Sequence, residues 1–190
     1  MPIKRTIITL VPLLAMFATL VSCTADQSEY EYRYPCRFKF NTLTHNGSEL
    51  KACVNPLSSG MFCFVRKESI KDVQHYIVSL YGKPEERNNP INTYEEKYPE
   101  SRLGANNGLV IGCSTLNNGE LYAFDLCCPK CLDESIYKMM TWDKSGQNVK
   151  CPRCGRSYNL NNGGFEDTGK EGKLMRYHAY FNGTVLTVTN

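Results

Sequence analysis

The chain is poor in histidine and tryptophan and carries little net charge. Its 190 residues include three histidines, one tryptophan, and 22 basic against 19 acidic side chains, a net charge of +3 at pH 7. Without a basic run or stripe, nucleic-acid binding has no electrostatic support. The sequence also lacks the glycine patterns of Rossmann and P-loop nucleotide sites. These absences leave cysteine as the residue type that carries most of the functional information.

Four of the ten cysteines form two Cys-x-x-Cys motifs. Cys128-Pro-Lys-Cys131 is followed, after a spacer of about twenty residues, by Cys151-Pro-Arg-Cys154 and Gly155, which is the spacing of a four-thiolate metal site. A proline restricts the backbone within each motif, and Gly155 permits a tight turn after the second. We therefore predict that Cys128, Cys131, Cys151 and Cys154 bind a metal. Two disulfides or two free thiol pairs are the alternative.

The N-terminus indicates export. Two basic residues precede a nearly unbroken apolar run at 7–21, and polar sequence begins after Cys23, a layout typical of a secretory signal. Leu20-Val21-Ser22-Cys23 also resembles the lipobox of bacterial lipoproteins. That resemblance implies a signal peptide over residues 1–22 and a lipid on the Cys23 sulfur, with an ordinary signal peptide or an uncleaved anchor as alternatives. We expect a membrane-anchored lipoprotein of the bacterial cell envelope that faces the periplasm or the exterior.

Five cysteines remain once Cys23 and the four predicted ligands are set aside. In an oxidising compartment four of them could form two disulfides in three pairings, whereas an unpaired cysteine packs as a small hydrophobic residue. The sequence does not choose between these states. Cys127 could also replace Cys128 as a ligand, although Cys128 preserves the two-residue spacing. The five are Cys36, Cys53, Cys63, Cys113 and Cys127.

The domain organisation follows from composition. We expect the lipidated cysteine and a polar tether over 23–45 and a single domain over 46–190. Within that domain, residues 83–107 are rich in Glu, Asn and Pro and predict a loop or insertion.

The rest of the domain has mainly strand patterns. Residues 52–65 are strand-like, and 69–80 fit either an amphipathic helix or a buried strand. Hairpins are predicted around Asn117-Asn118-Gly119 and around Asn182-Gly183. The fold class is therefore mainly β.

The order of elements over residues 108–190 resembles that of the Rieske iron–sulfur domain. A hairpin ending in Gly119–Asp125 (GELYAFD), two cysteine loops, the run from Ser157-Tyr158 to Gly163, and a closing hairpin follow one another as they do in that family. In particular the chain resembles Rieske-like lipoproteins of gut Bacteroidetes. The resemblance implies an antiparallel β sandwich with two metal-binding loops at one tip. It further implies that Gly155 and Tyr158 support the ligands, Tyr158 by bonding a cysteine sulfur.

The chain departs from the family at the histidine ligands. Cys154 occupies the position of the family's second histidine ligand. Lys130 occupies the position of the first histidine ligand, and Cys131 follows one residue later. The first interpretation is a [2Fe–2S] cluster on four thiolates, with a potential lowered toward that of all-cysteine ferredoxins. A single Zn²⁺ or Fe ion is the other, because paired motifs of this kind form closed tetrahedral sites. None of the histidines lies near a motif in sequence: His45, His75 and His178.

Function follows from the identity of the metal. A cluster predicts electron transfer at the envelope to a redox partner that the sequence does not name, whereas zinc predicts a binding or assembly module. An enzyme is less expected than either, and thiol–disulfide exchange lacks the usual helical context. Asp125, Lys130 and Arg153 are expected to be solvated loop charges, although the two basic residues could also offset the negative charge of the thiolates. Trp142 is expected to pack over a loop.

Overall fold

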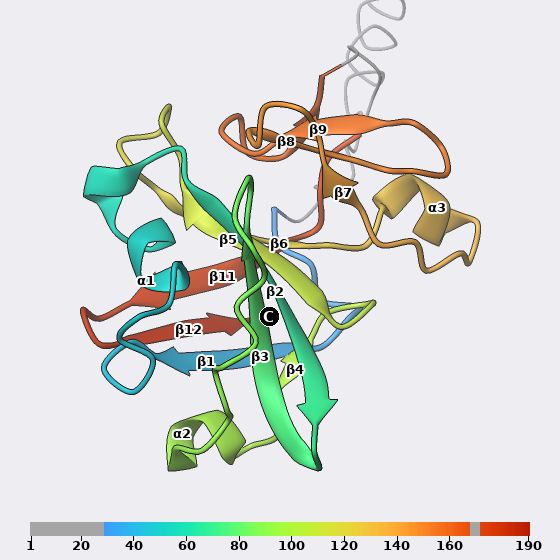
Figure 1. The fold of residues 1–190 in the computed structure, drawn as a ribbon. Helices are drawn as coiled ribbons and strands as arrows, with labels where there is room; N and C mark the ends of the chain where they lie inside the picture. Colours follow the sequence, from blue (N-terminus) through green and yellow to red (C-terminus); the bar gives the residue numbers. More distant parts are fainter. Residues whose placement is uncertain (1–28, 168–171) are drawn as a thin grey trace, which may run out of the picture.

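The computed structural model describes residues 29–167 and 172–190, which form a mainly β fold (Figure 1). The predicted signal peptide and Cys23 lie outside the described residues. Within those two ranges, no helix is both long enough and apolar enough to cross a membrane.

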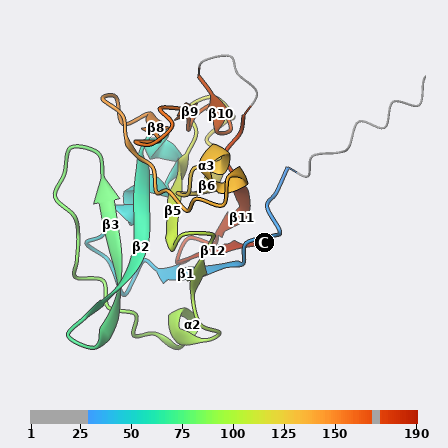
Figure 2. The ribbon, with the colours of Figure 1, turned by 90° about the vertical axis from the view of Figure 1, so that its right-hand side faces the viewer.

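A curled eight-stranded sheet forms the body of the fold, and every strand in it pairs antiparallel with its neighbours. Figure 2 shows how the sheet bends from the long β2–β3 hairpin round to β1 and β12. In order across the sheet the strands are β3 (Val73–Leu80), β2 (Phe62–Ile70), β5 (Gly108–Cys113), β6 (Leu121–Asp125), β11 (Arg176–Phe181), β12 (Val185–Thr189), β1 (Cys36–Asn41) and β4 (Arg102–Leu103).

The central strands of this sheet are buried on both faces. Along β5, Leu109 and Ile111 point into the larger hydrophobic core, and Val110 between them points into a second core on the opposite face. Strand β2 alternates in the same way, with Cys63 in the first core and Phe64 in the second. A strand that is covered on both sides has no solvent-exposed face. Its sequence is therefore a continuous apolar run without alternating polar residues.

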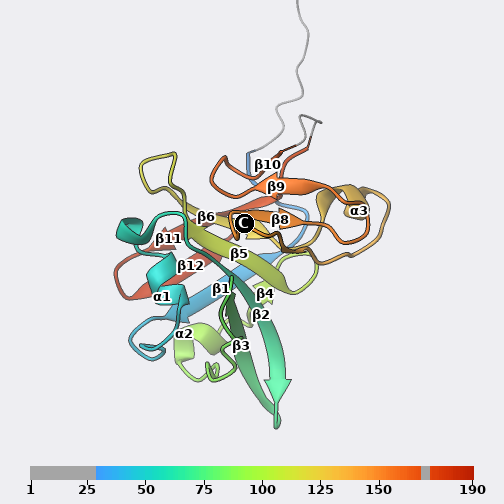
Figure 3. The same ribbon diagram turned by 45° about the horizontal axis from the view of Figure 1, so that its top comes forward.

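A smaller four-stranded antiparallel sheet covers the second core (Figures 1 and 3). One of its contacts with the main sheet is aromatic: the rings of Phe64 and Trp142 stack with centroids 3.8 Å apart. Trp142 therefore packs on strand β2, not over a loop. The strands, in order, are β10 (Phe165–Glu166), β9 (Ser157–Asn159), β8 (Asn148–Lys150) and β7 (Thr141–Trp142).

Helices are short and lie at the periphery. The α2 turn begins with a capping box, in which Thr93 and Glu96 satisfy each other's backbone N–H groups. The Glu96 carboxylate also accepts a hydrogen bond from the buried His45 ring at 2.9 Å, which ties α2 to the body of the fold. The helices are α1 (Leu50–Cys53), the 3₁₀ turn η1 (Pro56–Ser58), α2 (Tyr94–Lys97) and α3 (Pro129–Asp133).

The mainly β prediction is confirmed, and so are both hairpins, which form as β5–β6 and β11–β12. The ambiguous segment 69–80 is strand, with a turn at Lys71 and Asp72 that separates β2 from β3. Two expectations need correction. Residues 52–65 start as the end of α1 and a 3₁₀ turn before β2 begins, and β1 belongs to the sheet although it lies in the predicted tether, so the folded part starts before residue 46.

Candidate metal centre

The first cysteine motif lies where β6 leaves the main sheet. Cys128 precedes the first helical residue of α3, Pro129, and Cys131 lies within the helix. Proline suits this position because the first helical N–H has no partner in the helix. The Cys128 N–H donates to the Lys138 carbonyl at 2.8 Å, and its own carbonyl accepts from Leu132 at 3.0 Å. The backbone on both sides of Cys128 is thus fixed.

The second motif is the turn between β8 and β9. The Cys151 N–H donates to the Arg156 carbonyl at 2.9 Å, and the Gly155 N–H returns to the Cys151 carbonyl at 3.0 Å. Gly155 has a φ of +76°, and a Cβ at this position would meet nothing within 4 Å. Glycine is therefore required by the left-handed backbone and not by lack of space. The turn also directs the Cys154 N–H at the Cys151 sulfur, 3.5 Å away.

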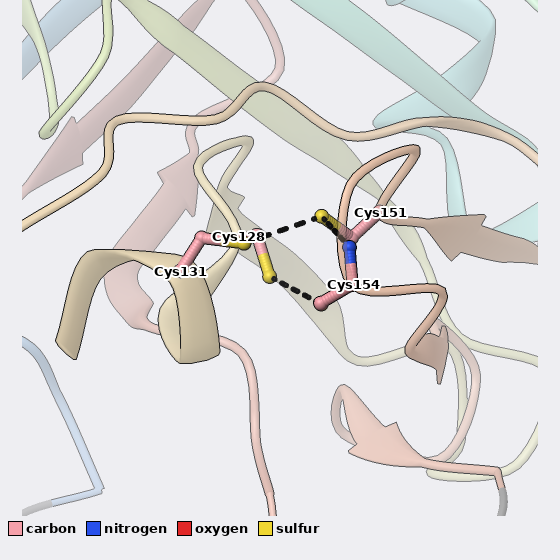
Figure 4. A group of neighbouring side chains, drawn as sticks. All are labelled: Cys128, Cys131, Cys151 and Cys154. Atoms are coloured by element: carbon pink, nitrogen blue, oxygen red, sulfur yellow. Dashed lines mark hydrogen bonds between the residues drawn. The ribbon is translucent and has the colours of Figure 1, made fainter. Parts of the chain in front are cut away.

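The two motifs bring all four predicted ligands together (Figure 4). Their sulfur atoms all lie within 4.8 Å of one another. Across the two loops, the Cys128 and Cys154 sulfurs are 3.6 Å apart, as are those of Cys131 and Cys151. Three of the four residues are buried in the second core, and Cys154 is exposed at its edge.

Cys127 does not join this group. It is buried in a separate small cluster with Leu132 and Met175, although it is adjacent to Cys128 in sequence. Because successive residues here point in different directions, only the Cys128 sulfur reaches the second loop. The group of four can therefore hold a metal ion without help from Cys127.

The surroundings of the four sulfurs shift the pKa values of the thiols in different directions. Burial opposes ionisation of Cys151, but the backbone N–H groups of Cys154 and Arg153 outweigh it and lower the pKa of Cys151 to about 7. Burial raises the pKa of the Cys128 and Cys131 thiols. A bound cation would supply the positive charge that these buried thiols need in order to release their protons.

Arg153 is the basic side chain in contact with the site. Its guanidinium lies 3.8 Å from the Cys131 sulfur and pairs with Glu134 at 2.8 Å. Lys130 also approaches Glu134, at 3.7 Å, and is partly exposed. Both side chains are thus at least partly solvated, as expected, and Arg153 in addition lies against a ligand sulfur.

Tyr158 supplies a further observation on the fit of a metal. Its side chain is buried, and its hydroxyl has no hydrogen-bond partner among the described residues. Burial raises the pKa of Tyr158, and the neighbouring Cys128 sulfur adds to the effect. A buried hydroxyl without a partner is costly. A metal-bound thiolate at Cys128 would offer this hydroxyl an acceptor.

Asp125 differs from its expected role as a solvated charge. The residue is fully buried at the end of β6, and its carboxylate accepts hydrogen bonds from the N–H groups of Ala105 and Cys127, at 2.6 and 2.7 Å, and from the Tyr177 hydroxyl at 2.8 Å. These bonds fix the start of the first cysteine loop. A clue was available in the sequence, because Asp125 directly continues the buried run Leu121-Tyr-Ala-Phe.

No protein-family model matches the chain, and no curated protein matches it significantly. The functional conclusion therefore rests on the four cysteines and on their surroundings.

Proposed function

We propose that Cys128, Cys131, Cys151 and Cys154 bind one tetrahedral metal ion, Zn²⁺ in the first place, and that the domain is a metal-stabilised binding or assembly module. The observation that carries this proposal is the compactness of the group, with every sulfur within 4.8 Å of every other.

The separations of the sulfurs suit one ion. With Zn–S bonds of about 2.3 Å, the corners of a tetrahedron stand roughly 3.8 Å apart. The two cross-loop pairs, at 3.6 Å, are close to that value. A [2Fe–2S] cluster places two thiolates on each of two irons with sulfides between them, which spreads the two ligand pairs farther apart.

The donor set favours a structural role for that ion. Four thiolates complete the coordination of zinc, and a catalytic zinc site keeps one position for water or substrate. The ion would join α3, which follows β6 of the main sheet, to the β8–β9 turn of the smaller sheet. It would thereby fix the smaller sheet over the second core.

A [2Fe–2S] electron carrier at the envelope is the second candidate. It is favoured by the position of Tyr158 beside Cys128 and by the Rieske-like order of loops and hairpins. In that case an unidentified redox partner would approach the exposed Cys154, where the site reaches the surface.

The location at the membrane is part of the proposal. The lipobox-like sequence ending at Cys23 would attach the domain to the envelope of a bacterium, on the periplasmic or the outer side. The chain from Cys23 to β1 would be the link between lipid and domain. The module would then recruit a protein partner to the membrane surface.

The two candidates are separated by metal and sulfide analysis of the full chain in detergent, with visible absorption and EPR. About one zinc per chain in a colourless protein supports the module, whereas about two irons and two acid-labile sulfides with a visible spectrum support the carrier. Substitution with Co²⁺ adds a direct test, since its absorption reports a tetrahedral thiolate site.

Variants test the ligand assignment. Cys128→Ser should lose the metal, whereas the matched variant Cys127→Ala, one residue away, should keep it. Retention of a full complement of metal by Cys128→Ser, or its loss only in Cys127→Ala, would show that the assigned ligand set is incorrect.

A further inference from the structure

A second pair of cysteines lies on the far side of the main sheet from the metal centre. Cys53 ends α1, and Cys63 is the second residue of β2. Both are fully buried in the larger core. No bond joins them in the structure, and their sulfur atoms are 2.7 Å apart.

This separation leaves no room between the sulfurs. Packed heavy atoms that are not bonded lie roughly 3.5–4.0 Å apart. The cross-loop sulfurs of the metal centre keep 3.6 Å, enough for an ion to lie among them. Among the described residues, Cys53 and Cys63 belong to no group of three or more possible metal ligands. A covalent bond is the chemistry that fits two sulfurs in this position.

We propose that Cys53 and Cys63 form a disulfide that fastens α1 and the η1 loop to strand β2. In the reaction each thiol gives up one proton and one electron, and a sulfur–sulfur bond forms. The two electrons pass to a disulfide donor, such as oxidised glutathione or a disulfide oxidase, whose own bond is reduced to two thiols. This proposal does not depend on the metal centre.

The burial of the pair determines when the bond forms. Thiol–disulfide exchange needs a thiolate that the donor can reach. Neither sulfur is accessible in the folded domain, and the contact with the Cys53 thiol, together with burial, holds the pKa of Cys63 well above its ordinary range. The donor therefore reacts before α1 docks, and docking then protects the bond from reductants.

Cys113 is the alternative partner. It is buried on β5, which pairs with β2. Burial raises the pKa of Cys113 to about 11, and the nearby Cys53 sulfur adds to this effect. However, no sulfur–sulfur contact joins Cys113 to either member of the pair, whereas Cys53 and Cys63 are in contact. Cys113 therefore remains a free thiol, as does Cys36, which lies in the same core as the pair.

Peptide mapping tests the assignment. The full chain is refolded in detergent with a mixture of reduced and oxidised glutathione, then denatured in iodoacetamide and digested with trypsin. Residues 52–66 contain no internal Lys or Arg, so both cysteines fall in one peptide. We expect that peptide to lack alkyl groups and to weigh two hydrogens less than its reduced form. Alkylation of both cysteines, or a link from this peptide to the one that contains Cys113, would overturn the proposal.

A stability measurement provides a second test. A phosphine reductant that is present while the chain refolds keeps Cys53 and Cys63 reduced, because it acts before docking buries the bond, and it leaves metal-bound thiolates in place. The wild type refolded in this way should have a Tm roughly 5–10 °C below that of the oxidised wild type, as expected for a bridge that closes a loop of this length. The variant Cys53→Ala should show no such shift, and the control Cys36→Ala, which alters a buried cysteine elsewhere, should retain it. An equal response in Cys53→Ala and the wild type would refute the bridge.

Discussion

Burial of Asp125 should make the stability of this domain fall as pH rises toward neutrality. The carboxylate is fully buried and accepts three hydrogen bonds. Burial nevertheless outweighs these bonds and raises its pKa from an ordinary 3.8 to about 6. The folded protein thus holds a proton that the unfolded chain has already released. The stability that this group contributes is complete below the ordinary pKa and is lost as the pH passes through about 6.

The size of the effect follows from the two pKa values. Each unit of pKa difference corresponds to about 1.36 kcal/mol, so the contribution of Asp125 to the free energy of unfolding should fall by about 3 kcal/mol between about pH 4 and pH 7. An asparagine at this position cannot titrate. Asp125→Asn should cost stability at every pH, because its amide N–H₂ would face the Ala105 N–H, but it should lack this pH dependence.

The assay is urea denaturation of the two proteins over a series of pH values, followed by the fluorescence of Trp142, the only tryptophan. The quantity of interest is the free energy of unfolding of the wild type minus that of Asp125→Asn. Both proteins share the same metal ligands, so loss of metal in acid affects both curves and largely cancels. We expect the difference to fall by about 3 kcal/mol as pH rises.

A difference that stays flat over this range would refute the reasoning, since it would mean that Asp125 keeps an ordinary pKa in the folded state. Tyr177→Phe provides an independent check. It removes the hydroxyl that donates to the carboxylate at 2.8 Å and so removes one of the interactions that lower the pKa of Asp125. The fall in stability should then move to higher pH.

Three further predictions concern the contacts that hold the fold together. A strong chelator should lower the Tm of the wild type but not that of Cys151→Ser; equal shifts in a thermal melt would argue against a metal there. Phe64→Ala removes the stack on Trp142 and should lower the free energy of unfolding, measured by urea denaturation, by about 3–5 kcal/mol. A decrease of less than about 1 kcal/mol would contradict a packing role for this ring. Glu96→Ala leaves the buried His45 ring without its hydrogen-bond acceptor and should cost roughly 1–3 kcal/mol by the same assay; an unchanged midpoint would show that the pair adds no stability.

The features that could be predicted from the sequence are those that local patterns determine. The two hairpins follow from turn residues between apolar runs, and both form. The four cysteines come together because each motif sets its own loop geometry, and the two loops then meet across the cysteine sulfurs. Over 69–80 the local pattern allowed a helix or a strand. Pairing of β3 with β2 along its whole length decided for strand.

The features that could not be predicted depend on residues far apart in the chain. Residues 36–41 alternate apolar and polar side chains, which is a local strand signal, but the partner of this strand, β12, lies about 150 residues away and could not be identified from the sequence. Burial of Asp125 depends on Ala105 and Tyr177, which lie on either side of it in sequence but outside any common motif. The contact between Cys53 and Cys63 likewise depends on how α1 docks onto β2, a tertiary arrangement that cysteine counting does not supply.

The placement of the cysteines on the two faces of the main sheet explains how one chain could support two thiol chemistries. Cys53 and Cys63 lie in the core on one face, and Cys128, Cys131 and Cys151 lie in the core on the other. Strands β2, β5 and β6 separate the two groups, so in the folded state an oxidised sulfur of one group cannot exchange with a thiol of the other. Mispairing is then possible only before the sheet forms. A metal that binds early would reduce it further, because a thiolate bound to a metal is no longer free to attack a disulfide.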